Sequence, residues 1–139
     1  VVVSPPLVEK EDGFALWVDK IVKLSSELTV PIHHLGHPNT QEIISKHKGA
    51  GNFTFQNFTD WENPLQCSRQ IRKNDMIVFV SAHSGSVSHI PVLDTLPQRL
   101  ERRFPNHSRI VIFPKQHVPE EQGDKLMETR DVLFSNNYV

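Results

Sequence analysis

The sequence predicts one α/β domain built on a five-stranded, parallel, doubly wound sheet with the strand order 3-2-1-4-5. Three observations support this fold class. Short apolar runs alternate with helical patterns along the chain, the connections between them are short, and residues 76–80 are continuously apolar. Such a run is typical of a central parallel strand covered on both faces. Right-handed crossovers between strands of this kind give a doubly wound sheet.

Apolar spacing and proline positions predict the elements of the first half. The β-branched opening run is a strand that Pro5 and Pro6 end, because proline cannot donate to a sheet. Apolar residues three and four apart, from Phe14 to Leu28, predict a helix with one buried face. Phenylalanines alternating with polar residues predict a half-exposed strand. In chain order we expect strand 1–3, helix 11–28, strand 30–35, helix 40–48 and strand 52–58.

Capping residues and proline place the later elements. A third helix begins after Asp60 or Asn63, with Pro64 accepted in its first turn. The helix after strand 76–80 begins at Asp94 or Thr95, because Pro97 is tolerated only near a helix start. A fifth strand over 110–113 completes a domain that we place at residues 1–114.

Residues 115–139 are predicted to form a carboxyl-terminal tail. Periodicity fades there, and 126–134 is compatible with either a short helix or a strand. The fifth strand is expected at a sheet edge, and exposed edges invite pairing, so a homodimer is one expectation. The tail would instead cover that edge or take part in the dimer contact. These alternatives stay open at the level of sequence.

Composition excludes several classes of function. The formal net charge of -1 gives no electrostatic basis for a nucleic-acid partner. Cys67 is the only cysteine, so the chain forms no internal disulfide, which favours a reducing compartment. No apolar run approaches the ~20 residues that cross a bilayer. The chain opens on valine rather than methionine, and we therefore expect a domain of a longer polypeptide.

A ligand is expected where open α/β sheets bind small molecules, at the carboxyl ends of the first and fourth strands. The loop after the fourth strand is rich in serine and contains one glycine. It lacks the Gly-x-Ser-x-Gly context of a hydrolase nucleophile, so we expect no catalysis. A nucleotide or another small molecule is the expected class of ligand. The candidate ligand-binding residues are Ser4, Pro5, Ser81, Ser84, Gly85, Ser86 and Ser88.

Histidine and cysteine give no metal or redox site by their spacing. His33 and His34 are neighbours on a strand and point to opposite faces, so they cannot hold one ion together. His34 with His37 remains conceivable, but no third ligand is near in sequence. We therefore predict no metal and no cofactor. Cys67 is interpreted as a buried, inert thiol.

A basic group lies on the helix after the serine-rich loop. Arg99, Arg102 and Arg103 are spaced to share one side of that helix, away from its apolar residues. A solvated helix face is the ordinary interpretation. The alternative is a docking surface for an acidic partner or for lipid headgroups.

The loop resembles that of the universal stress protein family, whose members share the predicted fold. Nucleotide-binding members carry Gly-x-x-Gly, nine residues and then Gly-Ser/Thr after the fourth strand. The matching positions here are Ala82-His-Ser-Gly85 and Thr95-Leu96, so only Gly85 is kept. Glycine lets backbone amides approach phosphates closely. Two or three lost bonds to a charged group weaken binding by roughly 10² to 10⁶-fold, so we expect no tight ATP binding.

A second resemblance covers nearly the whole chain. The segments quoted below are similar to the cytoplasmic carboxyl-terminal domain of bacterial cation:proton antiporters, in which a stress-protein-like domain follows a membrane-embedded transporter. This resemblance implies a non-catalytic regulatory domain at the cytoplasmic face of the inner membrane, with an upstream transmembrane antiporter domain as partner. The alternative is a free-standing universal stress protein that binds ATP or another nucleotide. The segments are Glu9-Lys-Glu-Asp-Gly-Phe14, Asp60-Trp61, Asn74-Asp75, Ser81-Ala-His-Ser-Gly-Ser-Val-Ser88, Leu93-Asp94-x-Leu96-Pro97 and Phe113-Pro114.

Overall fold

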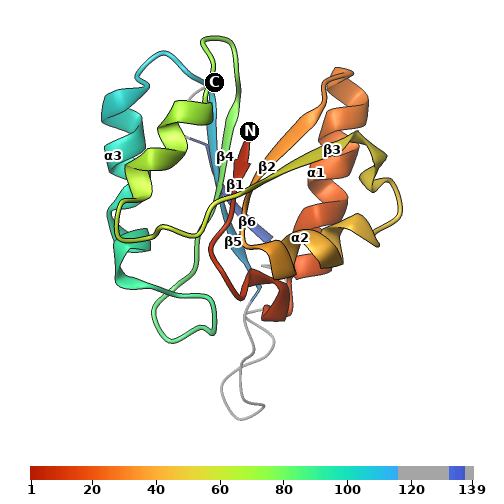
Figure 1. The fold of residues 1–139 in the computed structure, drawn as a ribbon, viewed down its shortest axis with the longest axis horizontal. Helices are drawn as coiled ribbons and strands as arrows, with labels where there is room; N and C mark the ends of the chain where they lie inside the picture. The colour runs from red at the N-terminus through yellow and green to blue at the C-terminus, as the bar shows by residue number, and fades with distance from the viewer. Residues whose placement is uncertain (116–131, 137–139) are drawn as a thin grey trace.

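The predicted fold class is confirmed. A computed structural model describes residues 1–115 and, for the backbone, 132–136. Five parallel strands form a sheet in the order 3-2-1-4-5, and an antiparallel sixth strand follows β5 (Figure 1). The strands are β1 (Val2–Val3), β2 (Ile32–Gly36), β3 (Phe53–Asn57), β4 (Ile77–Val80), β5 (Arg109–Pro114) and β6 (Val132–Asn136).

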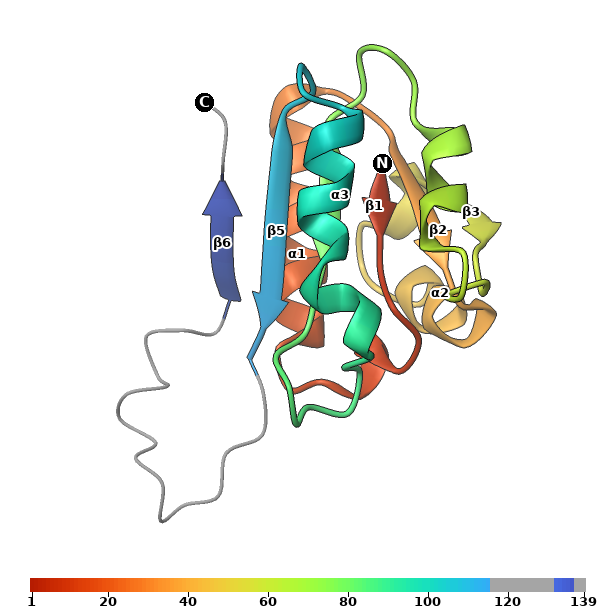
Figure 2. The ribbon, with the colours of Figure 1, turned by 90° about the vertical axis from the view of Figure 1, so that its left-hand side faces the viewer.

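Helices cover both faces of the sheet. One face carries α1 (Phe14–Leu28) and α2 (Pro38–Ser45), and the other carries α3 (Leu96–Arg103) with the 3-10 helix η3 (Pro64–Gln70) (Figures 1 and 2). Because β1 is followed by α1 and β4 by α3, the chain leaves the two central strands toward opposite faces. This divergence makes the carboxyl ends of β1 and β4 the switch point of the sheet.

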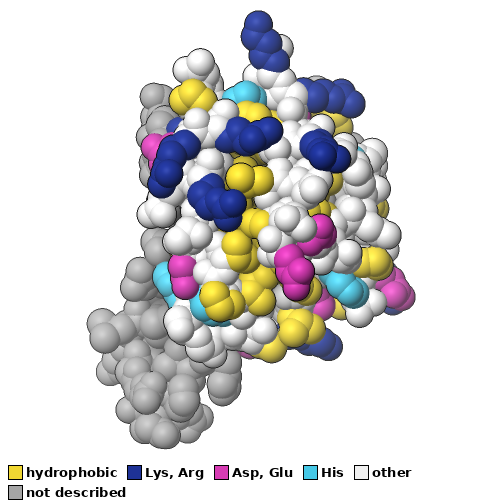
Figure 3. All heavy atoms as spheres, turned by 60° about the vertical axis from the view of Figure 1, so that its left-hand side comes forward, with side chains coloured by type: hydrophobic (Ala, Val, Ile, Leu, Met, Phe, Trp, Pro, Cys, Tyr) yellow, Lys and Arg dark blue, Asp and Glu magenta, His cyan; other side chains and the backbone are white. Residues whose placement is uncertain are grey.

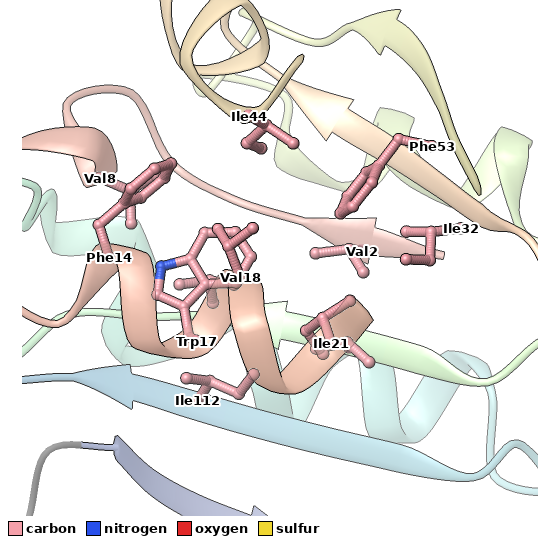
Figure 4. Packing of buried hydrophobic residues seen from close by; sticks show 12 residues of the cluster. Val2, Val8, Phe14, Trp17, Val18, Ile21, Ile32, Ile44, Phe53 and Ile112 are labelled. Atoms are coloured by element: carbon pink, nitrogen blue, oxygen red, sulfur yellow. The ribbon is translucent and has the colours of Figure 1, made fainter. Parts of the chain in front are cut away.

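The α1 face of the sheet holds one hydrophobic cluster. Trp17 and Val18 are fully buried, and Phe14 meets the Trp17 ring edge-on at 5.3 Å (Figure 4). Strand residues Val2 and Ile112 face them from the sheet. The predicted buried stripe is confirmed from Phe14 to Ile21. The prediction that Leu28 is buried is wrong, because this side chain is half exposed at the last turn of α1. Leu24 is partly buried.

The opposite face holds a second cluster under α3 and η3. Leu96 and Leu100 of α3 pack with Cys67 of η3 against Val3 and Phe79 of the central strands. The sheet therefore has an apolar core on each side, which explains the continuously apolar β4.

Element boundaries differ from the predicted ones where capping decides them. Helix α1 begins at Phe14 rather than at residue 11, because Val8–Lys10 form a separate 3-10 turn before it. Helix α2 begins at Pro38, and His37 caps it by accepting a hydrogen bond from the Asn39 amide at 3.0 Å. The third helix is a 3-10 helix that follows Asn63.

The edge of the sheet also differs from the expected one. All of β6 pairs antiparallel with residues 110–114 of β5, so β5 is not an edge strand. Pairing of two copies through a free β5 edge is therefore excluded in this arrangement, although a homodimer by another surface stays a prediction. The rest of the predicted tail, residues 116–131 and 137–139, lies outside the described residues.

Candidate functional site

Ser4, which directly follows β1, belongs to a buried hydrogen-bond cluster. Its hydroxyl lies 2.8 Å from Nε2 of His34, and both side chains are fully buried. The Gln41 amide lies 3.4 Å from Nδ1 of the same ring and also donates to the Gln56 carbonyl at 2.8 Å. These side chains join β1, β2 and α2 at the carboxyl end of the sheet.

The direction of the hydrogen bonds shows that this cluster is structural. Because the Gln41 amide donates to Nδ1, the proton of the neutral His34 ring sits on Nε2 and is donated to Ser4. A general base would have to accept from the serine hydroxyl instead. Burial, and to a smaller extent His33, lowers the pKa of His34 to about 3, so the ring stays neutral. The cluster holds the strand ends together and offers no nucleophile.

The loop after β4 encloses a carboxylate of the same chain. Glu11 is 6% exposed, and the hydroxyls of Ser86 and Ser88 and the amides of Val87 and Ser88 lie close enough to stabilise its charge. Even so, Oε2 of Glu11 and Oγ of Ser88 are buried without a hydrogen-bond partner of normal geometry. Amides and hydroxyls of this loop would face the phosphates of a bound nucleotide. In this chain an internal anion is in that position.

Burial controls the ionisation of Glu11. Desolvation raises the pKa of its carboxyl group, and the contacts with residues 86–88 offset only part of that rise. A group with a raised pKa binds more protons when folded than when unfolded, so stability decreases as pH rises from the ordinary carboxyl range through the raised value.

We expect Glu11→Gln to stabilise the fold at neutral pH by about 1 kcal/mol, because an amide avoids burying an incompletely solvated charge. The gain should disappear at a pH below the ordinary carboxyl range. Urea unfolding of the two proteins at both pH values measures the difference. Glu27→Gln, at an exposed position on α1, serves as the control. Equal stabilisation by both variants would contradict the assignment to burial.

A groove lies beside the loop, between β5 and α3. Its volume is about 480 Å³, and it includes Ser81 and Ser84 of the predicted residues. The His83 ring stacks on Phe113 at 4.3 Å and forms one wall. Asp94 and Glu101 contribute carboxylates to the lining, and the described lining residues include no lysine or arginine. This charge balance opposes a polyphosphate and suits a neutral or cationic group.

The predicted ligand-binding residues are thus divided among three environments. Ser4 joins His34, and Pro5 is buried beside it in the chain. Ser86 and Ser88 face Glu11. Ser81 and Ser84 line the groove, and Gly85 adopts a φ of 92° with open space around it.

Glu11 is the member of this region that sequence reasoning missed. In the sequence, its position favours a charge at the amino end of the next helix. Only the chain path after β1, which carries Glu11 back to the loop after β4, brings the two together. A contact between residues so far apart in sequence leaves no local signal.

The histidine and cysteine candidates have separate environments. His33 lies 2.8 Å from the Thr54 hydroxyl, His34 is internal and His37 caps α2. Within residues 1–115 no group of three histidine, cysteine or carboxylate side chains is arranged to hold a metal ion. Cys67 is buried as predicted, and burial raises the pKa of its thiol to about 11.

Comparison with protein-family models, with curated proteins and with solved structures finds no match to this chain. Among the described residues, no helix has the length and apolar character needed to span a bilayer. The function proposed below therefore rests on the charge and geometry of the switch point and on the sequence resemblances.

Proposed function

We propose that this chain is a non-catalytic regulatory domain of a membrane cation:proton antiporter and that it does not bind ATP tightly. The observation that supports the second part is the presence of carboxylates where a nucleotide would need cations. Glu11 lies against the loop after β4, and Asp94 and Glu101 line the groove beside it. Bringing a triphosphate to this place would bury like charges together, which is strongly unfavourable.

The environments of two candidate nucleophiles, Ser4 and Cys67, support the regulatory part of the proposal. The Ser4–His34 pair is fully buried and has its proton on the wrong nitrogen for nucleophilic catalysis. The Cys67 thiol is protonated at neutral pH because its pKa is raised. The tie to an antiporter rests on the sequence resemblance, which covers nearly all of residues 1–114.

Calorimetric titration with ATP and AMP tests the nucleotide part. We expect no saturable heat at micromolar nucleotide for the wild-type chain. Ser84→Trp, which places a bulky side chain at an exposed position lining the groove, serves as a blocked reference. Micromolar binding of ATP that Ser84→Trp abolishes would refute the proposal and favour a free-standing nucleotide-binding stress protein.

The reading frame upstream of Val1 tests the antiporter part. A transporter requires many apolar segments of ~20 residues each. Finding them in the same open reading frame supports the proposal, and a start codon immediately before Val1 refutes it. In a host transporter, deletion of residues 1–139 should change the pH or ligand dependence of antiport and leave the transport pathway itself intact.

A further inference from the structure

A groove between α3 and η3 has three arginines in its lining. Arg69 comes from η3, and Arg99 and Arg103 come from α3, so two elements contribute charge to one space of about 370 Å³. Figure 3 shows lysine and arginine side chains gathered over the upper part of this face, where one edge also carries an acidic side chain; the other acidic ones in view lie lower. We call this space the basic groove. It is completed by Glu62, Asn63, Pro64, Leu65, Gln66 and Ser68.

The arginines of the basic groove are not neutralised by the fold. Within residues 1–115, the guanidinium groups of Arg69 and Arg99 take part in no ion pair and no hydrogen bond. The charge of Arg103 lowers the pKa of the buried Cys67, and no carboxylate among residues 1–115 forms an ion pair with Arg103. Among the described lining residues, Glu62 is the single acidic one, and it is exposed. Guanidinium groups converging in this way are suited to phosphate, whose oxygens accept paired N–H bonds.

Exposed apolar side chains lie at the amino ends of the strands, the end of the domain at which α3 also ends with Arg103 (Figure 1). Leu28 is 50% exposed and Val30 is 45% exposed, and both border a second groove whose charged lining residues are Lys73 and Asp75. The loop that carries Lys73 follows η3 directly. Val1 lies in this second groove as well. Cations beside exposed aliphatic side chains are the combination found in proteins that bind the surface of anionic membranes.

We propose that this end of the domain binds the surface of anionic phospholipid membranes, with headgroup phosphates in the basic groove and Leu28 and Val30 at the acyl boundary. This deepens the proposed function and rests on it, since an antiporter domain is held next to a bilayer. A soluble nucleotide fits the basic groove less well, because the described residues that line it include no aromatic side chain to stack on a base. An acidic protein would not account for the exposed aliphatic residues.

Sedimentation of the 139-residue chain with lipid vesicles tests the proposal. We expect binding to vesicles of mixed phosphatidylglycerol and phosphatidylcholine, and little binding to phosphatidylcholine alone. Each cation near an anionic surface strengthens binding about fivefold, so Arg99→Gln with Arg103→Gln should weaken it about 30-fold. The control is Lys10→Gln with Lys48→Gln, which removes the same charge from exposed positions outside both grooves and should have a much smaller effect.

Two further arms separate a membrane surface from a free phosphate. Leu28→Ser should weaken vesicle binding severalfold and leave unfolding by urea almost unchanged, because Leu28 is half exposed. Glycerol phosphate, at the same phosphate concentration as the lipid, should not displace the protein. Displacement by glycerol phosphate, equal binding to both vesicle types, or an equal loss in the two double variants would each overturn the proposal. None of these results depends on nucleotide binding or on the upstream reading frame, so this inference and the proposed function fail separately.

Discussion

The wild-type chain should lose stability steeply between pH 6.5 and pH 3 as a result of one buried side chain, His34. Its pKa falls from the ordinary 6.5 to about 3 in the folded state, chiefly because burial disfavours the charged ring. Across that interval the unfolded chain takes up a proton that the folded chain does not accept. The stability that depends on neutral His34 is therefore fully present above pH 6.5 and is lost as pH falls toward 3.

The expected loss is on the order of 4 kcal/mol, a large part of the stability of a domain of this size. Urea unfolding over this pH range measures it, with His34→Gln as the variant that cannot titrate. His34→Gln should be less stable at neutral pH and should show a flatter dependence on pH. His37→Asn, which replaces the side chain that caps α2 with another good cap, should leave the wild-type slope intact. Parallel pH curves for wild type and His34→Gln would show that His34 is not the cause.

Gly36→Ala should destabilise the fold by about 2–3 kcal/mol, because the new methyl group has no space. A Cβ at Gly36 would lie 2.6 Å from Cε1 of His34 and 3.1 Å from Oγ of Ser4. Both side chains are fully buried and bonded to each other, so they cannot move aside without breaking the cluster. The effect arises from crowding, since the backbone of Gly36 needs no left-handed conformation.

Gly51→Ala provides the matched control. A Cβ at Gly51 meets nothing within 4 Å, and its φ is not positive, so the change should stay within about 0.5 kcal/mol. Urea midpoints of the two variants measure the contrast. If crowding against His34 is the cause, the cost of Gly36→Ala should shrink in a His34→Ala background. Equal costs at Gly36 and Gly51, or an unchanged cost in that background, would contradict the explanation.

Glu11 joins two parts of the chain at the switch point. The loop after β4, in which Gly85 adopts a left-handed conformation, presents amides and hydroxyls at the carboxyl end of the sheet. In this chain Glu11 lies against them, and Glu11 is attached to the segment that leads into α1. The carboxyl group of Glu11 therefore links the connection between β1 and β2 to the connection between β4 and β5.

Local sequence patterns were sufficient to predict the fold class. The apolar stripe from Phe14 to Ile21, the continuous apolar run of β4 and the position of Pro97 near a helix start depend on neighbouring residues alone. Leu28 did not follow the stripe, because at the last turn of α1 half of its side chain is exposed. The third predicted helix is a 3-10 helix rather than an α-helix. Over so few residues, the spacing of apolar side chains does not distinguish the two kinds of helix.

The sequence by itself determined the alternation of strands and helices and the apolar core on both sides of the sheet, because periodicity, proline and glycine act locally. Tertiary structure alone decided that Glu11 lies against that loop, that Ser4 bonds to His34 and that Arg69 joins Arg99 and Arg103. Each of these contacts joins residues that the crossover connections bring together from distant parts of the chain. The charge and burial of these side chains depend on the path of the chain through space, and a short stretch of sequence does not reveal that path.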